Sequence, residues 1–238
     1  MENKSNSKTF NFTDISDYIF YLSELIIDTI QKKERIEYYL KEIENVIETN
    51  PKAKLINADI YDAISDKTMR PMQYIFNLLG DESKKAVSYR KFRKILFNNK
   101  SKLGIQLDKL NLEEESILGQ FNQIRNWGLH IPESLFLQKK SFFKMDKDFI
   151  LENKKKIIIP KYDNFEIEFL HKFKGEIQEV VTAIEIILTR MKSDYEALIG
   201  ETFELEYEDN FVKPYLIMKI AQDSWDVQNG KQVNERTK

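Results

Sequence analysis

Cysteine is absent from the 238-residue chain, and histidine occurs only twice. The absence of cysteine excludes a disulfide scaffold, a thiol nucleophile and every metal site with cysteine ligands. The two histidines are not accompanied by a cluster of other metal-ligating side chains in the sequence. We therefore expect no metal and no other cofactor.

Glycine and proline are also scarce, with seven and five residues. The closest two glycines, Gly119 and Gly128, lie nine positions apart. Phosphate-binding loops and dinucleotide-binding turns need clustered glycines, because their backbone N–H groups must approach the phosphate closely. Both motifs are therefore excluded, and the low content of turn-forming residues favours a helical protein over a β sandwich.

Long uninterrupted apolar runs are missing as well. Acidic residues such as Asp17 and Glu185 interrupt the apolar stretches at 15–30 and 180–190, so we expect no membrane span and no membrane partner. The first ten residues, MENKSNSKTF, lack the apolar segment of a secretion signal, and we expect a cytoplasmic protein. The 37 basic and 39 acidic residues give a net charge of -2, so any surface that binds nucleic acid has to be local.

The residues that are present favour long amphipathic helices. With 42% hydrophobic and 32% charged residues, the chain can form both a core and a solvated surface. Apolar side chains recur at steps of three and four residues over 14–49, 112–129 and 165–199, which is the periodicity of a helix face. We therefore predict an all-α fold, a multi-helix antiparallel bundle over residues 1–200. Residues 201–238 are expected to form a C-terminal appendage that packs on this domain or extends from it.

Shorter elements complete the predicted architecture. The same periodicity predicts shorter helices at 55–66, 71–80, 83–98 and 133–143. Minor short strands are expected near 155–160 and 203–208, where the sequences KKKIIIPKY and FELEYE would pair with lysine facing glutamate.

Local signals predict several helix ends. Thr13 is the expected N-cap of the first helix, and an Asn-Pro pair at 50–51 ends it. Gly80 has the position of a helix stop. Asn111 and Glu114 have the spacing of a capping box, in which each side chain accepts a hydrogen bond from the other residue's backbone N–H.

Two lysine-rich segments each have two interpretations. The basic helix at 83–98 is either a solvated face over a core stripe or a surface that follows the phosphates of RNA. The segment 139–156 is either a solvated loop or a guide for an RNA backbone. The candidate RNA-binding residues in these two segments are Lys91, Arg93, Lys94, Lys139 and Lys140.

Arg125 breaks the amphipathic pattern of the helix at 112–129. On a helical wheel it lies within about 40° of Leu118 and Phe121, on the apolar stripe. A guanidinium there cannot lose its charge, so it needs a carboxylate, a helix C-terminus or the phosphate of a ligand. Violations of patterning of this kind concentrate at functional sites.

His130 follows Arg125 by five positions. Gly128 weakens the helix and Pro132 cannot donate a backbone hydrogen bond, so we expect the helix to end or bend between these two residues. Such a bend would turn the imidazole of His130 toward the side on which the guanidinium of Arg125 lies.

An arginine and a histidine at one site suit the metal-independent cleavage of RNA. The ribose 2′-hydroxyl attacks its own phosphodiester, the imidazole of His130 transfers a proton, and the guanidinium of Arg125 stabilises the charge of the phosphorane. The expected products carry a 2′,3′-cyclic phosphate and a 5′-hydroxyl. In a symmetric dimer, two His130 side chains would divide the acid and base steps.

The segment RNWGLH at 125–130 resembles the R-x4-6-H signature of the HEPN superfamily of helical domains. This resemblance implies a HEPN-like bundle that forms a homodimer with a composite active site. It further implies an endoribonuclease in a toxin–antitoxin, abortive-infection or other antiphage defence system. By position, Arg125 and His130 would be catalytic, and Asn126 would orient the phosphate or the histidine. The implied partners are RNA, a second copy of the chain, and an antitoxin or a nucleotidyltransferase.

Other interpretations of the same residues stay open. The chain is alternatively a non-catalytic HEPN-like interaction module that binds a nucleotide or a partner protein. In a purely structural reading, Arg125 pairs with a carboxylate such as Glu115 or Asp108, and His130 caps its helix. Trp127 is either an anchor in a core or dimer interface or a platform on which an RNA base stacks.

Overall fold

The computed structural model describes residues 9–129, 133–145, 147–153 and 159–208, the single residues 155 and 157, and residues 215–229. Over these residues the chain forms eight helices and two short strands. The helices are α1 (Ile15–Thr49), α2 (Ala58–Gly80), α3 (Tyr89–Leu103), α4 (Leu112–Leu129), α5 (Glu133–Phe142), α6 (Lys147–Asn153), α7 (Ile167–Ile199) and α8 (Tyr215–Gln228). The strands are β1 (Leu55–Asn57) and β2 (Asn164–Glu166). The prediction of an all-α, multi-helix bundle is confirmed.

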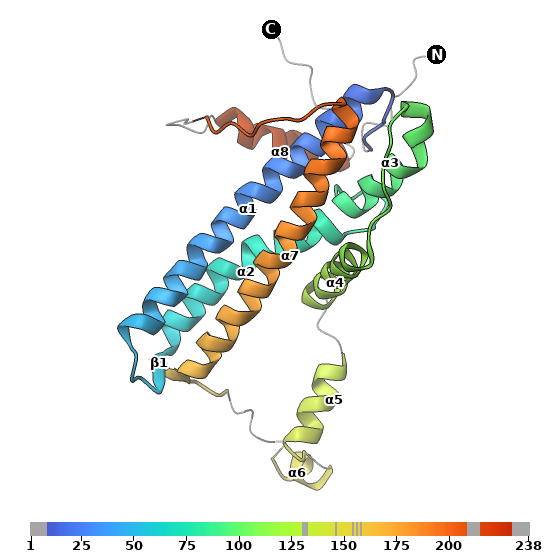
Figure 1. The fold of residues 1–238 in the computed structure, drawn as a ribbon. Coiled ribbons are helices and arrows are strands. Elements are labelled where there is room, and N and C mark those ends of the chain that lie inside the picture. The colour runs from blue at the N-terminus through green and yellow to red at the C-terminus, as the bar shows by residue number, and fades with distance from the viewer. Residues whose placement is uncertain are drawn as a thin grey trace.

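Three helices that lie side by side form the centre of the bundle (Figure 1). α1 runs in one direction, and α2 and α7 pack along it in the opposite direction. α4 packs against α2, and the shorter α3 packs against both α1 and α2. The helices predicted at 14–49, 112–129, 133–143 and 165–199 correspond to α1, α4, α5 and α7.

The hydrophobic core lies where the apolar faces of these helices meet. It includes the buried side chains of Leu22 and Ile43 in α1, Leu79 in α2, Leu118 in α4 and Ile177 in α7. Each fully buried side chain of this size contributes about 1.5–3 kcal/mol. The periodicity of three and four residues that identified the helices therefore also supplies the faces that hold them together.

The two strands are short and precede two of the long helices. They pair antiparallel in the register Leu55–Glu166, Ile56–Phe165 and Asn57–Asn164. The strands predicted near 155–160 and 203–208 are wrong, since residues 203–208 and the described residues of 155–160 form no strand. An alternating segment such as FELEYE forms a strand only where a partner edge satisfies its backbone groups. The packed bundle instead brings together the segments that lead into α2 and α7.

The helices predicted at 55–66 and 71–80 are in fact one helix, α2, which continues through Pro71. A proline in a helix interior removes one backbone hydrogen bond and usually ends or kinks the helix. Pro71 is buried between the helices, so tertiary packing outweighs the local penalty that the sequence signals.

Two helix starts differ from their predicted positions. The basic helix predicted at 83–98 is α3, which begins after its N-cap Ser88. The N-cap of α1 is Asp14 rather than Thr13, and its Oδ1 accepts a hydrogen bond of 2.8 Å from the N–H of Ser16. Both residue types are good N-caps, and the geometry of the chain selects the one nearer the helix.

The helices α5 and α6 lie beyond the bundle (Figure 1), and α5 buries none of its side chains. The lysine-rich segment 139–156 is therefore helical over much of its described length rather than a loop. The predicted appendage 201–238 contains α8, and the domain boundary at residue 200 stays a prediction. None of the helices formed by the described residues is long and apolar enough to cross a membrane.

Candidate functional site

Helix α4 carries the RNWGLH segment, and its first turn is fixed by hydrogen bonds. The predicted capping box is confirmed: the N–H of Asn111 donates to Oε2 of Glu114, and the N–H of Glu114 donates to Oδ1 of Asn111, both at 2.8 Å. The Nε of Arg190 in α7 donates to the other carboxylate oxygen of Glu114 at 2.7 Å. The start of α4 is therefore positioned against α7.

The crossing of α4 over α2 is closest at Gly80. A Cβ atom at this position would lie 2.6 Å from the backbone nitrogen of Asn122 and 2.9 Å from the carbonyl carbon of Phe121. Only a residue without Cβ allows this approach. The predicted helix end at Gly80 is confirmed. Gly80 is not among the glycines with positive φ, so it serves close packing rather than a left-handed turn.

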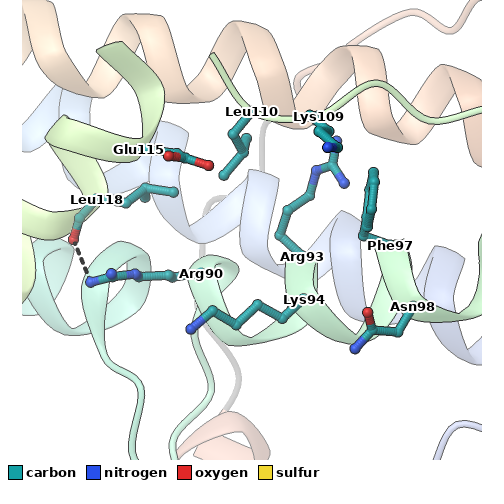
Figure 2. A pocket seen from close by; sticks show the side chains of 9 residues that line it. All are labelled: Arg90, Arg93, Lys94, Phe97, Asn98, Lys109, Leu110, Glu115 and Leu118. Atoms are coloured by element: carbon teal, nitrogen blue, oxygen red, sulfur yellow. Dashed lines mark hydrogen bonds between the residues drawn. The ribbon is translucent and has the colours of Figure 1, made fainter. Parts of the chain in front are cut away.

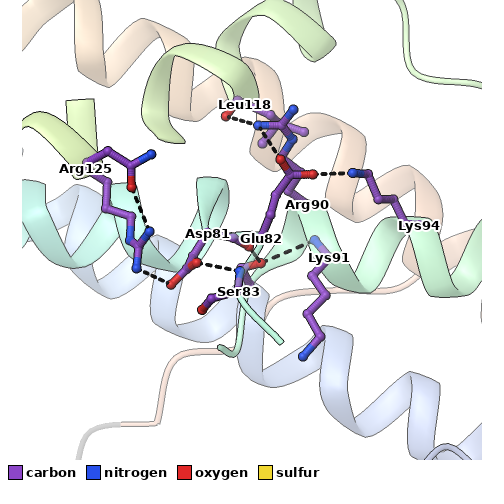
Figure 3. Close-up of polar contacts among 10 residues, drawn as sticks. Asp81, Glu82, Ser83, Arg90, Lys91, Lys94, Leu118 and Arg125 are labelled. Atoms are coloured by element: carbon purple, nitrogen blue, oxygen red, sulfur yellow. Dashed lines mark hydrogen bonds and ion pairs between the residues drawn. The ribbon is translucent and has the colours of Figure 1, made fainter. Parts of the chain in front are cut away.

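This close packing brings Arg125 of α4 onto the end of α2 (Figure 3). The Nε of Arg125 donates to Oδ1 of Asn77 at 2.8 Å, and its Nη2 lies 2.9 Å from Oδ2 of Asp81. Its Nη1 donates to Oδ1 of Asn126 at 2.9 Å. Asp81 is itself buried, and its Oδ1 accepts a hydrogen bond of 2.8 Å from the N–H of Ser83. The guanidinium plane is thus fixed from three sides.

The guanidinium of Arg125 is held but not enclosed. Its side chain is 20% exposed. An arginine has five N–H donors, and the contacts with described residues use three of them. One N–H on each terminal nitrogen is left for the oxygen of a ligand. The predicted alternative that Arg125 pairs with a carboxylate is confirmed, but the partner is Asp81 and not Glu115 or Asp108.

The other residues of the motif lie at the exposed end of α4. Asn126 is exposed and contacts Arg125, so it orients the arginine. Trp127 is 63% exposed and does not anchor the core of its own chain. α4 is described up to Leu129, and residues 130–132, within the range where the sequence predicts a bend, lie outside the described residues. His130 lies outside the described residues, and its predicted catalytic function stays a prediction.

Glu82, the residue after Asp81, pairs with basic side chains of α3 (Figure 3). Glu82 forms ion pairs with Arg90, at 3.4 Å, and with Lys94. These contacts lower the pKa of Glu82, chiefly because Lys94 donates a hydrogen bond to it. Two consecutive carboxylates therefore hold Arg125 on one side and two basic side chains of α3 on the other.

The predicted RNA-binding lysines differ in their exposure and in the contacts of their amino groups. Lys94 is 65% exposed and can turn toward a ligand. Lys91 donates to the backbone carbonyls of Lys84 and Ala86, at 2.6 and 3.1 Å, and so closes the loop before α3. Lys139 and Lys140 are exposed on α5, which Figure 1 shows apart from α3. The structure therefore does not gather these lysines into one surface.

Arg93, a predicted RNA-binding residue, is only 3% exposed. Its Nε lies 2.5 Å from Oδ2 of Asp194 in α7, and the hydroxyl of Tyr89 donates to the same oxygen at 2.7 Å. Burial raises the pKa of Asp194 to about 6, against the opposing effects of Arg93 and Tyr89. This ion pair holds α3 on α7, one helical turn from the contact between Arg190 and Glu114.

The sequence contains a signal for Asp194 that the prediction did not use. Asp194 follows Met191 by three positions and precedes Leu198 by four, so it lies on the apolar face of its helix. The same argument identified Arg125. No comparable signal exists for Asn77 or Asp81, because they contact α4 only after α2 and α4 have packed.

Comparisons of the chain with protein-family models, with curated proteins and with solved structures find no match. Among the residues that the structure describes, no three metal-ligating side chains lie close enough to hold a metal ion. A proposal for the function therefore depends on Arg125, its neighbours and the basic face of α3.

Proposed function

We propose that this chain is an endoribonuclease of the HEPN type, which acts as a homodimer and needs no metal ion. The observation that carries the proposal is the geometry of Arg125. Three contacts fix its guanidinium, while the side chain stays partly exposed with two N–H donors unused by described residues. A guanidinium held in this way can bind the non-bridging oxygens of a phosphodiester without first losing rotamer freedom.

In this mechanism the ribose 2′-oxygen forms a bond to phosphorus, and the bond from phosphorus to the 5′-oxygen breaks. His130 of one protomer accepts the proton of the 2′-hydroxyl, and His130 of the other protomer donates a proton to the leaving 5′-oxygen. Arg125 compensates the additional negative charge of the phosphorane. Asn126 keeps the guanidinium oriented through its hydrogen bond of 2.9 Å. The products are a 2′,3′-cyclic phosphate and a 5′-hydroxyl.

The exposed end of α4 supports the homodimer. Ile124 and Trp127 are exposed apolar side chains on either side of Arg125 in the sequence. Aromatic residues are enriched at the centres of protein interfaces, and a second copy that covers these two side chains would bring both motifs into one cleft. Such an enzyme would suit a toxin or another antiphage defence protein in the cytoplasm.

The test is cleavage of a single-stranded RNA by the purified chain in the presence of EDTA. Arg125→Ala and His130→Ala are each expected to lower the rate by at least about 100-fold. Arg70→Ala and His171→Ala are matched controls, because both side chains are exposed, and they should cleave like wild type. Circular dichroism shows whether each variant is folded. Folded Arg125→Ala and His130→Ala proteins that cleave at the wild-type rate would refute the proposal.

The ion pair with Asp81 favours a second candidate, an interaction module without catalysis. Asp81 neutralises the charge of Arg125 within the chain, so the arginine needs no ligand. The module would bind an antitoxin or a nucleotidyltransferase through the exposed end of α4. This candidate predicts no RNA cleavage, loss of the complex in Trp127→Ala, and an unchanged complex in His130→Ala. Co-purification with the product of the neighbouring reading frame would measure these effects.

A further inference from the structure

A hollow of about 800 Å³ opens between α3 and the segment 109–118, which includes the start of α4. Figure 2 shows that Arg90, Lys94 and Phe97 line it from α3, while Lys109 lines it from the facing segment. Its volume lies within the range of sites that bind small organic ligands.

Basic side chains outnumber acidic ones around this hollow. Arg90 and Lys94 share one carboxylate, Glu82, which leaves this group with one positive charge in excess. The lining also contains Lys109 and Glu115, whose charges balance each other. The hollow therefore favours an anion, and the exposed amino group of Lys94 can move from Glu82 to a ligand.

Part of the wall is apolar. Phe97, Leu110 and Leu118 line the hollow, and the Nζ of Lys100 lies 4.0 Å from the centre of the Phe97 ring. Arg93 also reaches the wall, but Asp194 already neutralises its charge. A ligand that combines an anionic group with a flat apolar body would satisfy both the basic and the apolar parts. A nucleotide has this combination.

We propose that the hollow binds one nucleotide of a single-stranded RNA. The phosphate lies at Arg90 and Lys94, where it takes the place of Glu82, and the base lies against Phe97 and Leu110. The inference deepens the proposed function and depends on it for the identity of the strand as RNA. It also replaces the predicted RNA contact of the buried Arg93 with contacts to its accessible neighbours.

The position of the hollow favours a strand over a free nucleotide. Asp81 holds Arg125, and the next residue, Glu82, holds Arg90 and Lys94 at the edge of the hollow (Figure 3). The Nη1 of Arg90 also donates to the backbone carbonyl of α4 at residue 118, at 3.4 Å, about 10 Å along the helix axis from Arg125. Neighbouring nucleotides of one strand can therefore occupy the hollow and the Arg125 site together.

The test is binding of a fluorescent 2′-O-methyl RNA oligonucleotide, measured by anisotropy. Its 2′-oxygen cannot attack, so binding is measured separately from cleavage. Lys94→Ala should weaken binding about 3- to 10-fold, because it removes a phosphate contact. Glu82→Gln should tighten binding about 3-fold or more, because it removes the competing carboxylate. Lys52→Ala, in the exposed turn before β1, is the matched control and should bind like wild type.

Opposite effects of Lys94→Ala and Glu82→Gln would support the proposal, because a folding defect cannot tighten binding. Wild-type affinity in both variants would overturn it. Inorganic phosphate that displaces the oligonucleotide as well as adenosine monophosphate does would also overturn it, because the base would then have no site. If the variants bind with the expected pattern but the protein does not cleave ordinary RNA, the proposed ribonuclease activity is refuted and the proposed nucleotide site is supported. Cleavage together with unchanged binding in the variants would refute the site alone.

Discussion

Replacement of Asp194 by alanine is expected to destabilise the bundle more than the loss of any exposed ion pair. Asp194 and Arg93 are 1% and 3% exposed, and their ion pair joins α7 to α3. Asp194→Ala leaves the guanidinium of Arg93 and the hydroxyl of Tyr89 buried without this partner. Removing one member of a buried pair costs about 3–5 kcal/mol, and we expect a loss of free energy of unfolding of this size.

Two further variants separate the ion pair from its hydrogen bond. Tyr89→Phe removes only the hydroxyl that donates to Asp194 at 2.7 Å, and it should cost about 1.5–3 kcal/mol. The double replacement Arg93→Met with Asp194→Leu removes both charges and keeps the volume apolar. It should cost less than Asp194→Ala alone, because no buried charge remains unpaired.

The assay is urea denaturation at pH 7, where Asp194 is ionised, followed by circular dichroism, with the slope of the transition as a check on two-state unfolding. Asp66→Ala is the matched control, because this aspartate is exposed on α2, and it should change the free energy by no more than about 0.5 kcal/mol. An Asp194→Ala protein that unfolds within about 1 kcal/mol of wild type would refute the buried pair. A double replacement that is less stable than Asp194→Ala would refute the argument that an unpaired charge is the cause.

Three other predictions test the fold and the setting of Arg125. Gly80→Ala should destabilise the protein by about 1–3 kcal/mol, because the new Cβ would clash with the backbone of α4. Gly119→Ala, where a Cβ meets nothing within 4 Å, should be neutral or stabilising. Thermal unfolding measures both variants, and equal effects would contradict the close crossing of α4 over α2. Asn111→Ala should cost about 1 kcal/mol through loss of the confirmed capping box. The matched control is Asn45→Ala, at an exposed position of α1, which should not lower the free energy of unfolding in urea denaturation. Because burial raises the pKa of Asp194 from 3.8 to about 6, the stability that this group contributes is fully present below pH 4 and is lost as the pH rises through 6. The difference in free energy of unfolding between wild type and Asp194→Ala should therefore be smaller at pH 7 than at pH 4. A difference that grows over this range would show that the pKa of Asp194 is not raised.

Elements whose signals are local could be predicted from the sequence. The capping box at Asn111 and Glu114 needs only residues within one helical turn, and it forms as predicted. The long helices follow from apolar periodicity, because the faces that define them are also the faces they bury. The strands could not be predicted, since β1 and β2 are far apart in the sequence and their pairing depends on α2 and α7 both packing on α1.

The candidate site was predictable in part. Arg125 was identified because a charge lies on an apolar stripe, and its side chain is indeed largely buried and paired. Its partner Asp81 was not identified, because the contact depends on the close crossing at Gly80. Arg93 is a candidate RNA-binding residue in the sequence, yet it is buried against Asp194. A helical wheel gives the direction of a side chain, but it does not show which charged side chain of a neighbouring helix lies opposite.

The sequence by itself determined that the chain forms long helices with apolar faces and that Arg125 lies on such a face, because these properties depend on the order of neighbouring residues. Only the tertiary structure decided which basic side chains are neutralised inside the protein and which are accessible. Asp194 pairs with the buried Arg93, and Asp81 pairs with the partly exposed Arg125. Lys94 stays exposed although it pairs with Glu82. The physical reason is that an ion pair depends on the separation of two groups in space, and packing sets that separation for residues far apart in the chain.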